Sequence, residues 1–151
     1  MKQEVEKVLT AKDVGPGFDQ GICCAMAVFG ELAEDVGLDK KTAYKIASGF
    51  GSGIGYGNAC GCVTGAIMAL GYKYGNFEPG QLEQKEIMKE KREAFLKEYK
   101  KRFGHFNCQE HLDNLNPMDP DDRKIIDERE LMYTVCPPMV AATCEIVRGL
   151  L

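Results

Sequence analysis

Three of the seven cysteines in this 151-residue chain lie where the local sequence predicts the first turn of a helix. Cys60 comes two residues after the candidate cap Asn58, Cys108 follows the candidate cap Asn107, and Cys136 precedes two prolines. A helix start presents unpaired backbone N–H groups and a partial positive charge, which together favour a thiolate over a thiol. Thiolates attack electrophiles, exchange disulfides and bind metals. The placement therefore predicts reactive sulfur.

The other four cysteines have more ambiguous positions. Cys24 lies away from the main apolar stripe of its predicted helix, which favours a role in a second interface or site, whereas Cys23 lies at the flank and is expected to pack structurally. Cys62 is two residues from Cys60, and it is equally consistent with packing and with a site. Cys144 shares an apolar stripe in the last predicted helix and is expected to lie in the core.

Two histidines, His105 and His111, lie on either side of Cys108 in the sequence. Cys108 and His111 are three residues apart and share a helix face, so a zinc site completed by cysteines is one alternative. A surface histidine is the commoner outcome. The sequence has no Cys-x-x-Cys-His motif, which excludes covalent attachment of c-type haem.

Glycine occupies every second position from 49 to 57, and this density predicts a loop. The segment does not match phosphate-binding glycine motifs, because no strand precedes it and no Gly-Lys-Ser/Thr follows. Its glycines would allow the backbone to pass close to a neighbouring helix or a bound cofactor. An anion-binding nest formed by amides of residues 58–60 is an alternative. The candidate cofactor-binding residues are Gly51, Gly53, Gly55, Gly57 and Cys62.

The hydrophobic periodicity predicts a single all-α domain over residues 1–151, a compact multi-helix bundle. A short helix is expected to precede Gly15-Pro16-Gly17, which would end it. Further helices are predicted over 20–36, after a cap at Asp39, over 60–70 with a stop at Gly71, and over 81–103. The last helices are expected after a capping box of Asn107 and Glu110, after Asp119, and over 136–147.

The overall composition limits the partners of the chain. A net charge of −4 argues against nucleic acid, and no apolar stretch is long enough to cross a membrane. The first residues have no apolar segment typical of a signal peptide, so we expect a cytoplasmic protein. In a reducing cytosol, cysteines more often serve catalysis, redox chemistry or metal binding than structural disulfides.

The runs Cys24-Ala25-Met26-Ala27-Val28, Gly49-Phe50-Gly51 and Cys60-Gly61-Cys62-Val63-Thr64-Gly65 resemble the C_GCAxxG_C_C family of redox-active proteins. Its four spaced cysteines match Cys24, Cys60, Cys108 and Cys136 in order. The resemblance implies a small helical protein with redox activity, similar to the helical part of split-Soret cytochromes, whose relatives carry an iron–sulfur centre. Cys62 departs from the pattern, which more usually has a small residue there.

Two hypotheses follow. In the first, Cys24, Cys60, Cys108 and Cys136 are the catalytic or metal-binding residues of an oxidoreductase or electron-transfer protein with an unknown redox partner. They either cycle between dithiol and disulfide, with Cys60 as the attacking thiolate, or ligate an iron–sulfur cluster or another thiophilic metal. In the second, the chain is a helical interaction module whose small-residue strip of Gly61, Gly65 and Ala69 packs helices closely, for example in a homodimer.

The first hypothesis makes a geometric prediction. The Cys60 sulfur should lie close to Cys24, with Cys108 and Cys136 brought in by their own helix starts and the glycine segment beside them. Cys23 and Cys144 should take no part.

Overall fold

A computed structural model describes residues 8–151, and within that range the fold is all-α. No strand occurs among these residues, and a single antiparallel bridge joins Ala59 to Asn107. The helices are α1 (Ala11–Asp19), α2 (Cys24–Val36), α3 (Lys40–Ala47), η1 (Gly53–Gly57), α4 (Gly61–Tyr74), α5 (Leu82–Phe103), α6 (Cys108–His111), α7 (Pro120–Glu128), α8 (Leu131–Thr134) and α9 (Cys136–Arg148).

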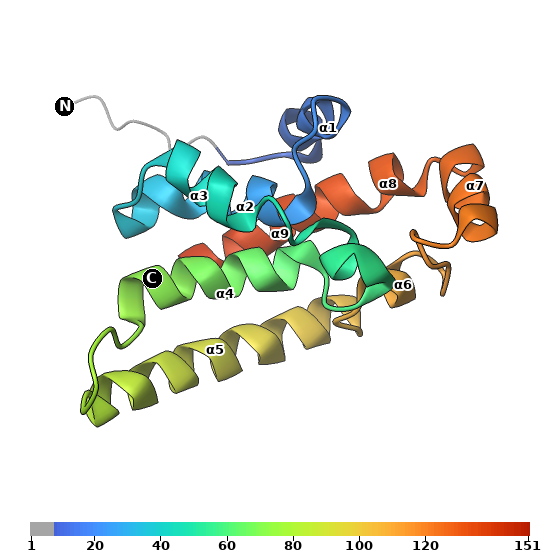
Figure 1. Ribbon diagram of the computed structural model, residues 1–151. Coiled ribbons are helices and arrows are strands. Elements are labelled where there is room, and N and C mark those ends of the chain that lie inside the picture. The colour runs from blue at the N-terminus through green and yellow to red at the C-terminus, as the bar shows by residue number, and fades with distance from the viewer. Residues whose placement is uncertain (1–7) are drawn as a thin grey trace.

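Helix α2 is the centre of the bundle, because it packs against α1, α3, α4 and α9. Figure 1 shows α4 and α5 running side by side along one face of the bundle, while η1 and α6 lie together at one end. Helix α2 buries residues around most of its circumference, including Cys24, Val28 and Leu32. The sequence placed Cys24 away from the main apolar stripe and favoured a role in a second interface, and Cys24 indeed faces α4 across the contact between α2 and α4.

Helices α2 and α4 approach each other closely, and two glycines make this approach possible. A Cβ on Gly61 would come within 2.7 Å of the backbone nitrogen of Ala25, and one on Gly65 within 2.7 Å of the carbonyl oxygen of Ala25. The small-residue strip predicted for close helix contact is thus occupied by α2 of the same chain. It is not available to a second copy.

Several helix boundaries follow from capping chemistry. Asp39 accepts a hydrogen bond from the Thr42 N–H at 2.8 Å and begins α3, and Asp119 accepts from two backbone N–H groups and begins α7. Helix α5 ends at Gly104, which has a left-handed φ of 81°. These three predictions are confirmed.

Other predicted boundaries were wrong. The helix expected over residues 3–9 lies mostly outside the described residues. Helix α1 begins at Ala11, where the backbone N–H and the hydroxyl of Thr10 both donate to the Asp13 carboxylate, and it runs through Gly15-Pro16-Gly17. Helix α2 begins at Cys24 instead of residue 20, and α4 continues past Gly71 to Tyr74. The Asn107 side chain makes no cap hydrogen bond, and Glu110 pairs with His105. The sequence did not predict α8.

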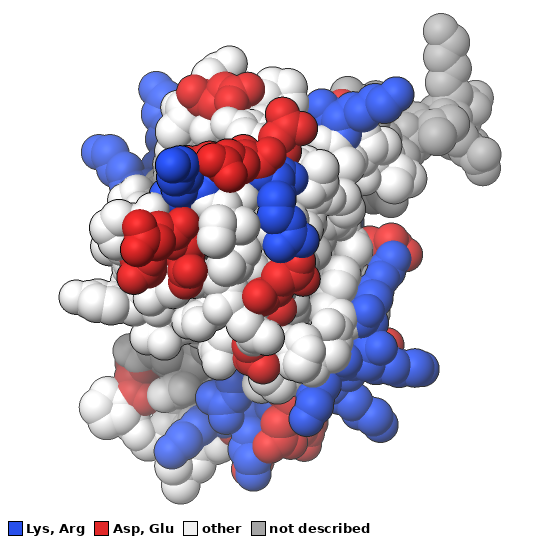
Figure 2. Space-filling view, turned by 90° about the vertical axis from the view of Figure 1, so that its right-hand side faces the viewer, with Lys and Arg blue, Asp and Glu red and all other residues white. Residues whose placement is uncertain are grey.

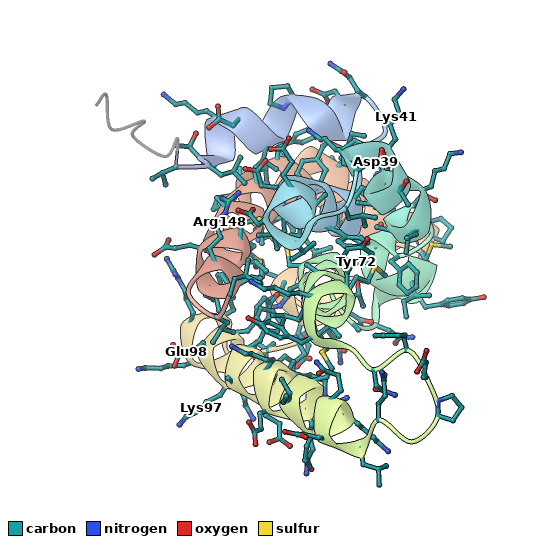
Figure 3. The ribbon with its side chains drawn as sticks, turned by 90° about the vertical axis from the view of Figure 1, so that its left-hand side faces the viewer. Asp39, Lys41, Tyr72, Lys97, Glu98 and Arg148 are labelled. Atoms are coloured by element: carbon teal, nitrogen blue, oxygen red, sulfur yellow. The ribbon has the colours of Figure 1, made fainter. Side chains whose placement is uncertain are left out.

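Charged side chains of both signs are interspersed over the molecular surface (Figure 2). The charged helix α5 buries Phe95 and Tyr99 on its inner side, while Lys97 and Glu98 point away from the body (Figure 3). One narrow stripe of the helix therefore rests on the bundle. None of the described helices is long and apolar enough to cross a lipid bilayer.

Candidate functional site

The bridge between Ala59 and Asn107 brings two of the four predicted cysteines to the same place. The backbone N–H of Cys60 donates to the carbonyl of Phe106 at 2.8 Å, and that of Cys108 donates to the carbonyl of Asn58 at 2.6 Å. Cys60 is the residue immediately before α4, and Cys108 is the first residue of α6. Because the amides of Asn58 and Cys60 are already bonded to the carbonyls of Gly53 and Phe106, residues 58–60 do not form the anion-binding nest that the sequence allowed.

The four predicted cysteines all lie at helix starts. Besides Cys60 and Cys108, Cys24 is the first residue of α2 and Cys136 is the first residue of α9. Sequence reasoning assigned this position to three of them and placed Cys24 inside a helix. The structure brings the beginnings of four helices together around one small cavity, so the partial positive charges of those helix ends are directed at the sulfur atoms.

A fifth cysteine, Cys62, lies inside this group. Cys62 lines the same small cavity as Cys24, Cys60, Cys108 and Cys136, and the thiols of Cys24 and Cys60 both act on the pKa of Cys62. Cys62 can share this cavity with Cys60, two residues earlier, because Cys60 is not yet helical, with φ −56° and ψ 139°. We call the five residues Cys24, Cys60, Cys62, Cys108 and Cys136 the cysteine cluster.

The two remaining cysteines lie outside the cluster, as the sequence predicted. Cys23 is half-buried, donates weakly to the carbonyl of Ala47, and lies against Gly51, where an added Cβ would come within 2.5 Å of the Cys23 Cβ. Cys144 is fully buried in the core on α9.

The glycine segment forms one tight turn, η1, closed by the Asn58 N–H donating to the carbonyl of Gly53 at 3.0 Å. Gly53, Gly55 and Gly57 all have a positive φ, so the turn depends on them. The residue of this segment that lines the cavity of the cysteine cluster is Ser52. Gly51 packs on Cys23 and Gly57 faces Gln109, so the segment shapes the site through Ser52.

Tyr99 and His111 complete the surroundings of the cluster. The Tyr99 hydroxyl lies 3.1 Å from Nε2 of His111. Burial, followed by Cys60 and Cys62, raises the pKa of Tyr99 far above its usual value. His111 lines the cavity together with Met132 and Met139. Tyr99 lies on the buried side of α5, and a buried tyrosine needs a partner for its hydroxyl, which is the signal that would have found it.

Burial and crowding dominate the acidity of the cluster. The hydrogen bond with Cys136 favours the Cys24 thiolate, but the contact with Cys62, burial and neighbouring thiols outweigh it, so the pKa of Cys24 is raised well above its usual value. The pKa of Cys108 is raised to about 12, first by burial and then by Cys136. The helix-start argument predicted the opposite direction, and it fails here because desolvation outweighs a partial charge.

The chain matches the C_GCAxxG_C_C family, whose description reads "Putative redox-active protein", over residues 22–150. It belongs to the C_GCAxxG_C_C family. No curated protein and no solved structure was found to match it.

The cluster of this C_GCAxxG_C_C protein is nearly closed to solvent. Cys62 has no exposed surface, and the other four cysteines each expose at most 8%. The cavity among them has a volume of about 10 Å³, which is about the room that one water molecule needs. Any reagent that reaches the sulfur atoms in this conformation must be of similar size.

The donor chemistry of the cluster suits a thiophilic metal, since four thiolates are the usual ligands of zinc or an iron–sulfur cluster. The arrangement does not suit one as it stands. Within residues 8–151, no three histidine, cysteine or acidic side chains are placed to hold one ion together. In that range, Cys108 and His111 likewise have no third ligand placed to complete a zinc site with them. His111 is instead hydrogen-bonded to Tyr99. The iron–sulfur centre stays a prediction.

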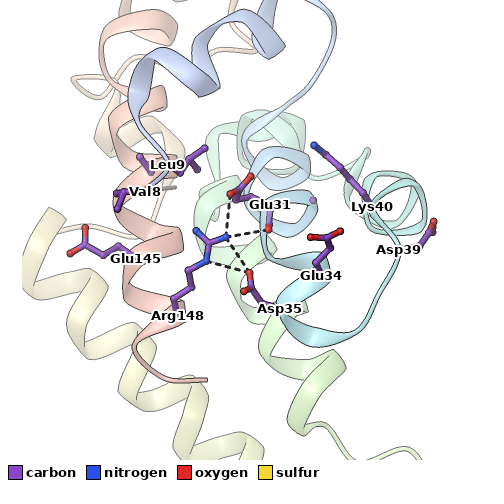
Figure 4. Close-up of a pocket in the computed structure, with 11 residues that line it drawn as sticks. Val8, Leu9, Glu31, Glu34, Asp35, Asp39, Lys40, Glu145 and Arg148 are labelled. Carbon is purple, nitrogen blue, oxygen red and sulfur yellow. Dashed lines mark hydrogen bonds and ion pairs between the residues drawn. The ribbon is translucent and has the colours of Figure 1, made fainter. Parts of the chain in front are cut away.

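A larger cavity, of about 790 Å³, lies between α2, α3 and α9 and contains no cysteine. Arg148 crosses it and pairs with Glu31 and Asp35 at 3.1 Å each (Figure 4). These ion pairs join the end of α9 to α2, so they stabilise the packing of the two helices that supply Cys136 and Cys24.

Proposed function

We propose that this chain is a thiol redox protein in which the cysteine cluster is converted reversibly between thiols and disulfides. The observation that carries the proposal is that Cys24, Cys60, Cys62, Cys108 and Cys136 line one cavity with a volume of about 10 Å³. Their thiols come from the starts of four helices and need little movement to pair. Cys24 with Cys136, and Cys60 with Cys62, are the two pairs that we expect to form.

The size of the cavity limits the oxidant. A disulfide reagent or a protein disulfide is far larger than one water molecule, whereas hydrogen peroxide is only slightly larger. Formation of one disulfide removes two electrons and two protons from two thiols. Hydrogen peroxide takes up those two electrons and two protons and becomes two water molecules, so the reaction is balanced without a further reagent. The expected oxidant is therefore a small peroxide.

Burial also explains why the thiols would persist until such an oxidant arrives. The raised pKa of Cys24, Cys62, Cys108 and Cys136 keeps these thiols protonated at neutral pH, and protonated thiols react slowly with external disulfides. A large disulfide would have to open the helix bundle before it could react. The closure of the site thus favours small oxidants, while the raised pKa values slow the reaction of these four thiols with any oxidant.

The test compares oxidants on the reduced, full-length protein prepared anaerobically. We expect about two thiols to be lost per hydrogen peroxide consumed, dithiothreitol to restore them, and oxidised glutathione to react at least tenfold more slowly. A variant lacking Cys23 and Cys144 should behave like the wild type. Equal rates with both oxidants would contradict the proposal. A purified protein that carries iron, with visible absorption and no free thiols in the cluster, would replace it with the metal hypothesis.

A further inference from the structure

One wall of the cavity that the cysteine cluster lines is built differently from the rest. Helices α2, α4 and α9 contribute lining residues from within the packed bundle, whereas Ser52 comes from the glycine segment at one end of the molecule (Figure 1). The two large side chains that follow Ser52 face solvent, since Ile54 is 47% exposed and Tyr56 is 71% exposed. This wall therefore fixes no large side chain in the core, which is typical of segments that open locally.

The backbone of this wall is held in a conformation that its residues disfavour. Ser52 has φ 52° and ψ 38°, and Ile54 has φ 61° and ψ 31°, so both lie in the left-handed region. Residues other than glycine rarely adopt that region, and a β-branched residue such as Ile54 is especially unfavourable there. Because nearly half of the Ile54 side chain is exposed, packing returns little of this cost. Opening of the segment would release the strain.

The strained residues lie between two anchored points. On one side, Gly51 packs on Cys23, where an added Cβ would come within 2.5 Å of the Cys23 Cβ. On the other side, the carbonyl of Asn58 is tied to the first amide of α6 by a hydrogen bond of 2.6 Å. Between them, the Asn58 N–H closes the turn by donating to the carbonyl of Gly53 at 3.0 Å. Residues 52–57 can therefore swing outward on fixed ends once this bond breaks.

We propose that residues 52–57 form a lid over the cysteine cluster, and that its local opening is the route by which a dithiol reductant reaches the cluster disulfides. This inference rests on the proposed function, which requires the thiols to be restored after oxidation. A dithiol is far larger than the cavity volume of about 10 Å³, so a wall must move before it can react. The lid is the wall whose movement leaves the three long helices packed.

The reduction that the open lid admits is balanced. One sulfur of the dithiol attacks a cluster disulfide, a mixed disulfide forms, and the first cluster sulfur leaves with the proton that the attacking thiol gave up. The second thiol of the reductant then attacks the mixed disulfide and releases the other cluster sulfur, which takes up the second proton. Two electrons and two protons pass from the dithiol to the cluster, and the reductant becomes a disulfide.

The test measures how fast N-ethylmaleimide labels each cysteine of the reduced, full-length protein, with the peptides resolved by mass spectrometry. Cys144 is the internal reference, because it is fully buried in the core and should be labelled only on global unfolding. We expect the cluster cysteines to be labelled at least tenfold faster than Cys144. Low urea should accelerate the labelling of Cys144 and leave that of the cluster nearly unchanged, because an opening lid exposes much less surface than unfolding.

Two substitutions in the lid should shift its opening in opposite directions. Gly53→Ala adds a Cβ that would collide with the backbone of Asn58 at a φ of 62°, so cluster labelling should rise at least tenfold. Ile54→Asn places a residue that tolerates the left-handed region at the strained position, so cluster labelling should fall at least threefold. Gly80→Ala is the matched control. Its φ is 89° in open space between α4 and α5, so it adds backbone strain far from the lid and should leave cluster labelling unchanged.

The proposal is overturned if the wild-type cluster is labelled no faster than Cys144, because the bundle then opens only as a whole. It is also overturned if Ile54→Asn, and Gly53→Ala if it folds by circular dichroism, are labelled like the wild type, because a different wall then opens. Either result leaves the proposed function intact. A wild-type protein that forms no disulfide with peroxide would instead contradict the proposed function, and the labelling rates would still show whether the lid opens.

Discussion

Gly61 and Cys24 lie so close that a Cβ on Gly61 would come within 2.9 Å of the Cys24 Cβ. Gly61 separates Cys60 from Cys62, and Cys24 begins the central helix. The absence of a side chain at position 61 therefore allows the start of α4, which carries Cys62, to pack against Cys24. This glycine thus contributes both to the helix packing and to the assembly of the site.

Replacing Gly61 with alanine should destabilise the protein by about 1–3 kcal/mol, because the added methyl group pushes α4 away from α2. Gly71→Ala is the matched control in the same helix. Its added Cβ would meet only Met88, at an ordinary 3.8 Å, and alanine favours the helix, so the free energy of unfolding should rise by up to about 1 kcal/mol. Urea unfolding measures both. Equal effects of the two substitutions would contradict this account of the helix contact.

Cys144→Ala should cost about 1–2 kcal/mol at pH 7 through lost core packing, with no loss of thiol cycling. Burial raises the pKa of Cys144 to about 12, whereas an unfolded cysteine titrates near 8.5. Between these values the unfolded wild type loses a proton that the folded wild type retains, so wild-type stability falls as the pH rises. The difference between the two proteins should therefore shrink from pH 7 to pH 10 in urea unfolding under reducing conditions. A constant or growing difference would exclude a buried neutral thiol.

Cys62→Ala should fold. When a peroxide oxidises Cys60 to a sulfenic acid in this variant, the Cys62 thiol with which it would form a disulfide is missing. After peroxide treatment we expect dimedone to label Cys60 in this variant but not in the wild type, as measured by mass spectrometry. Cys23→Ala is the control and should give no label. If Cys62→Ala leaves Cys60 unlabelled and forms all the wild-type disulfides that do not involve Cys62, then Cys62 is not the thiol that reacts with oxidised Cys60.

The sequence was most informative where the chemistry is local. The carboxylates of Asp39 and Asp119 cap helices directly, and Gly104 ends α5, because each depends on a few neighbouring residues. The helix starts at Cys60, Cys108 and Cys136 were found from the same kind of signal, within one residue. The burial of Cys144 followed from helical periodicity alone.

The features that the sequence did not predict depend on contacts between distant segments. The bridge of Ala59 and Asn107 joins residues 48 positions apart, and the hydrogen bond between Tyr99 and His111 joins α5 to α6. The direction of the thiol pKa shifts also needed the packed structure, because desolvation depends on what surrounds each sulfur. The role of Cys62 was undecided for the same reason.

The most direct test of the account is to map the disulfides of the native, full-length protein after one equivalent of hydrogen peroxide. The reduced protein is oxidised anaerobically, its remaining thiols are alkylated, and peptides are identified by mass spectrometry. The account predicts disulfides confined to Cys24, Cys60, Cys62, Cys108 and Cys136, with Cys23 and Cys144 recovered as alkylated thiols. Disulfides that include Cys23 or Cys144, or a cluster that stays fully reduced while peroxide is in excess, would contradict it.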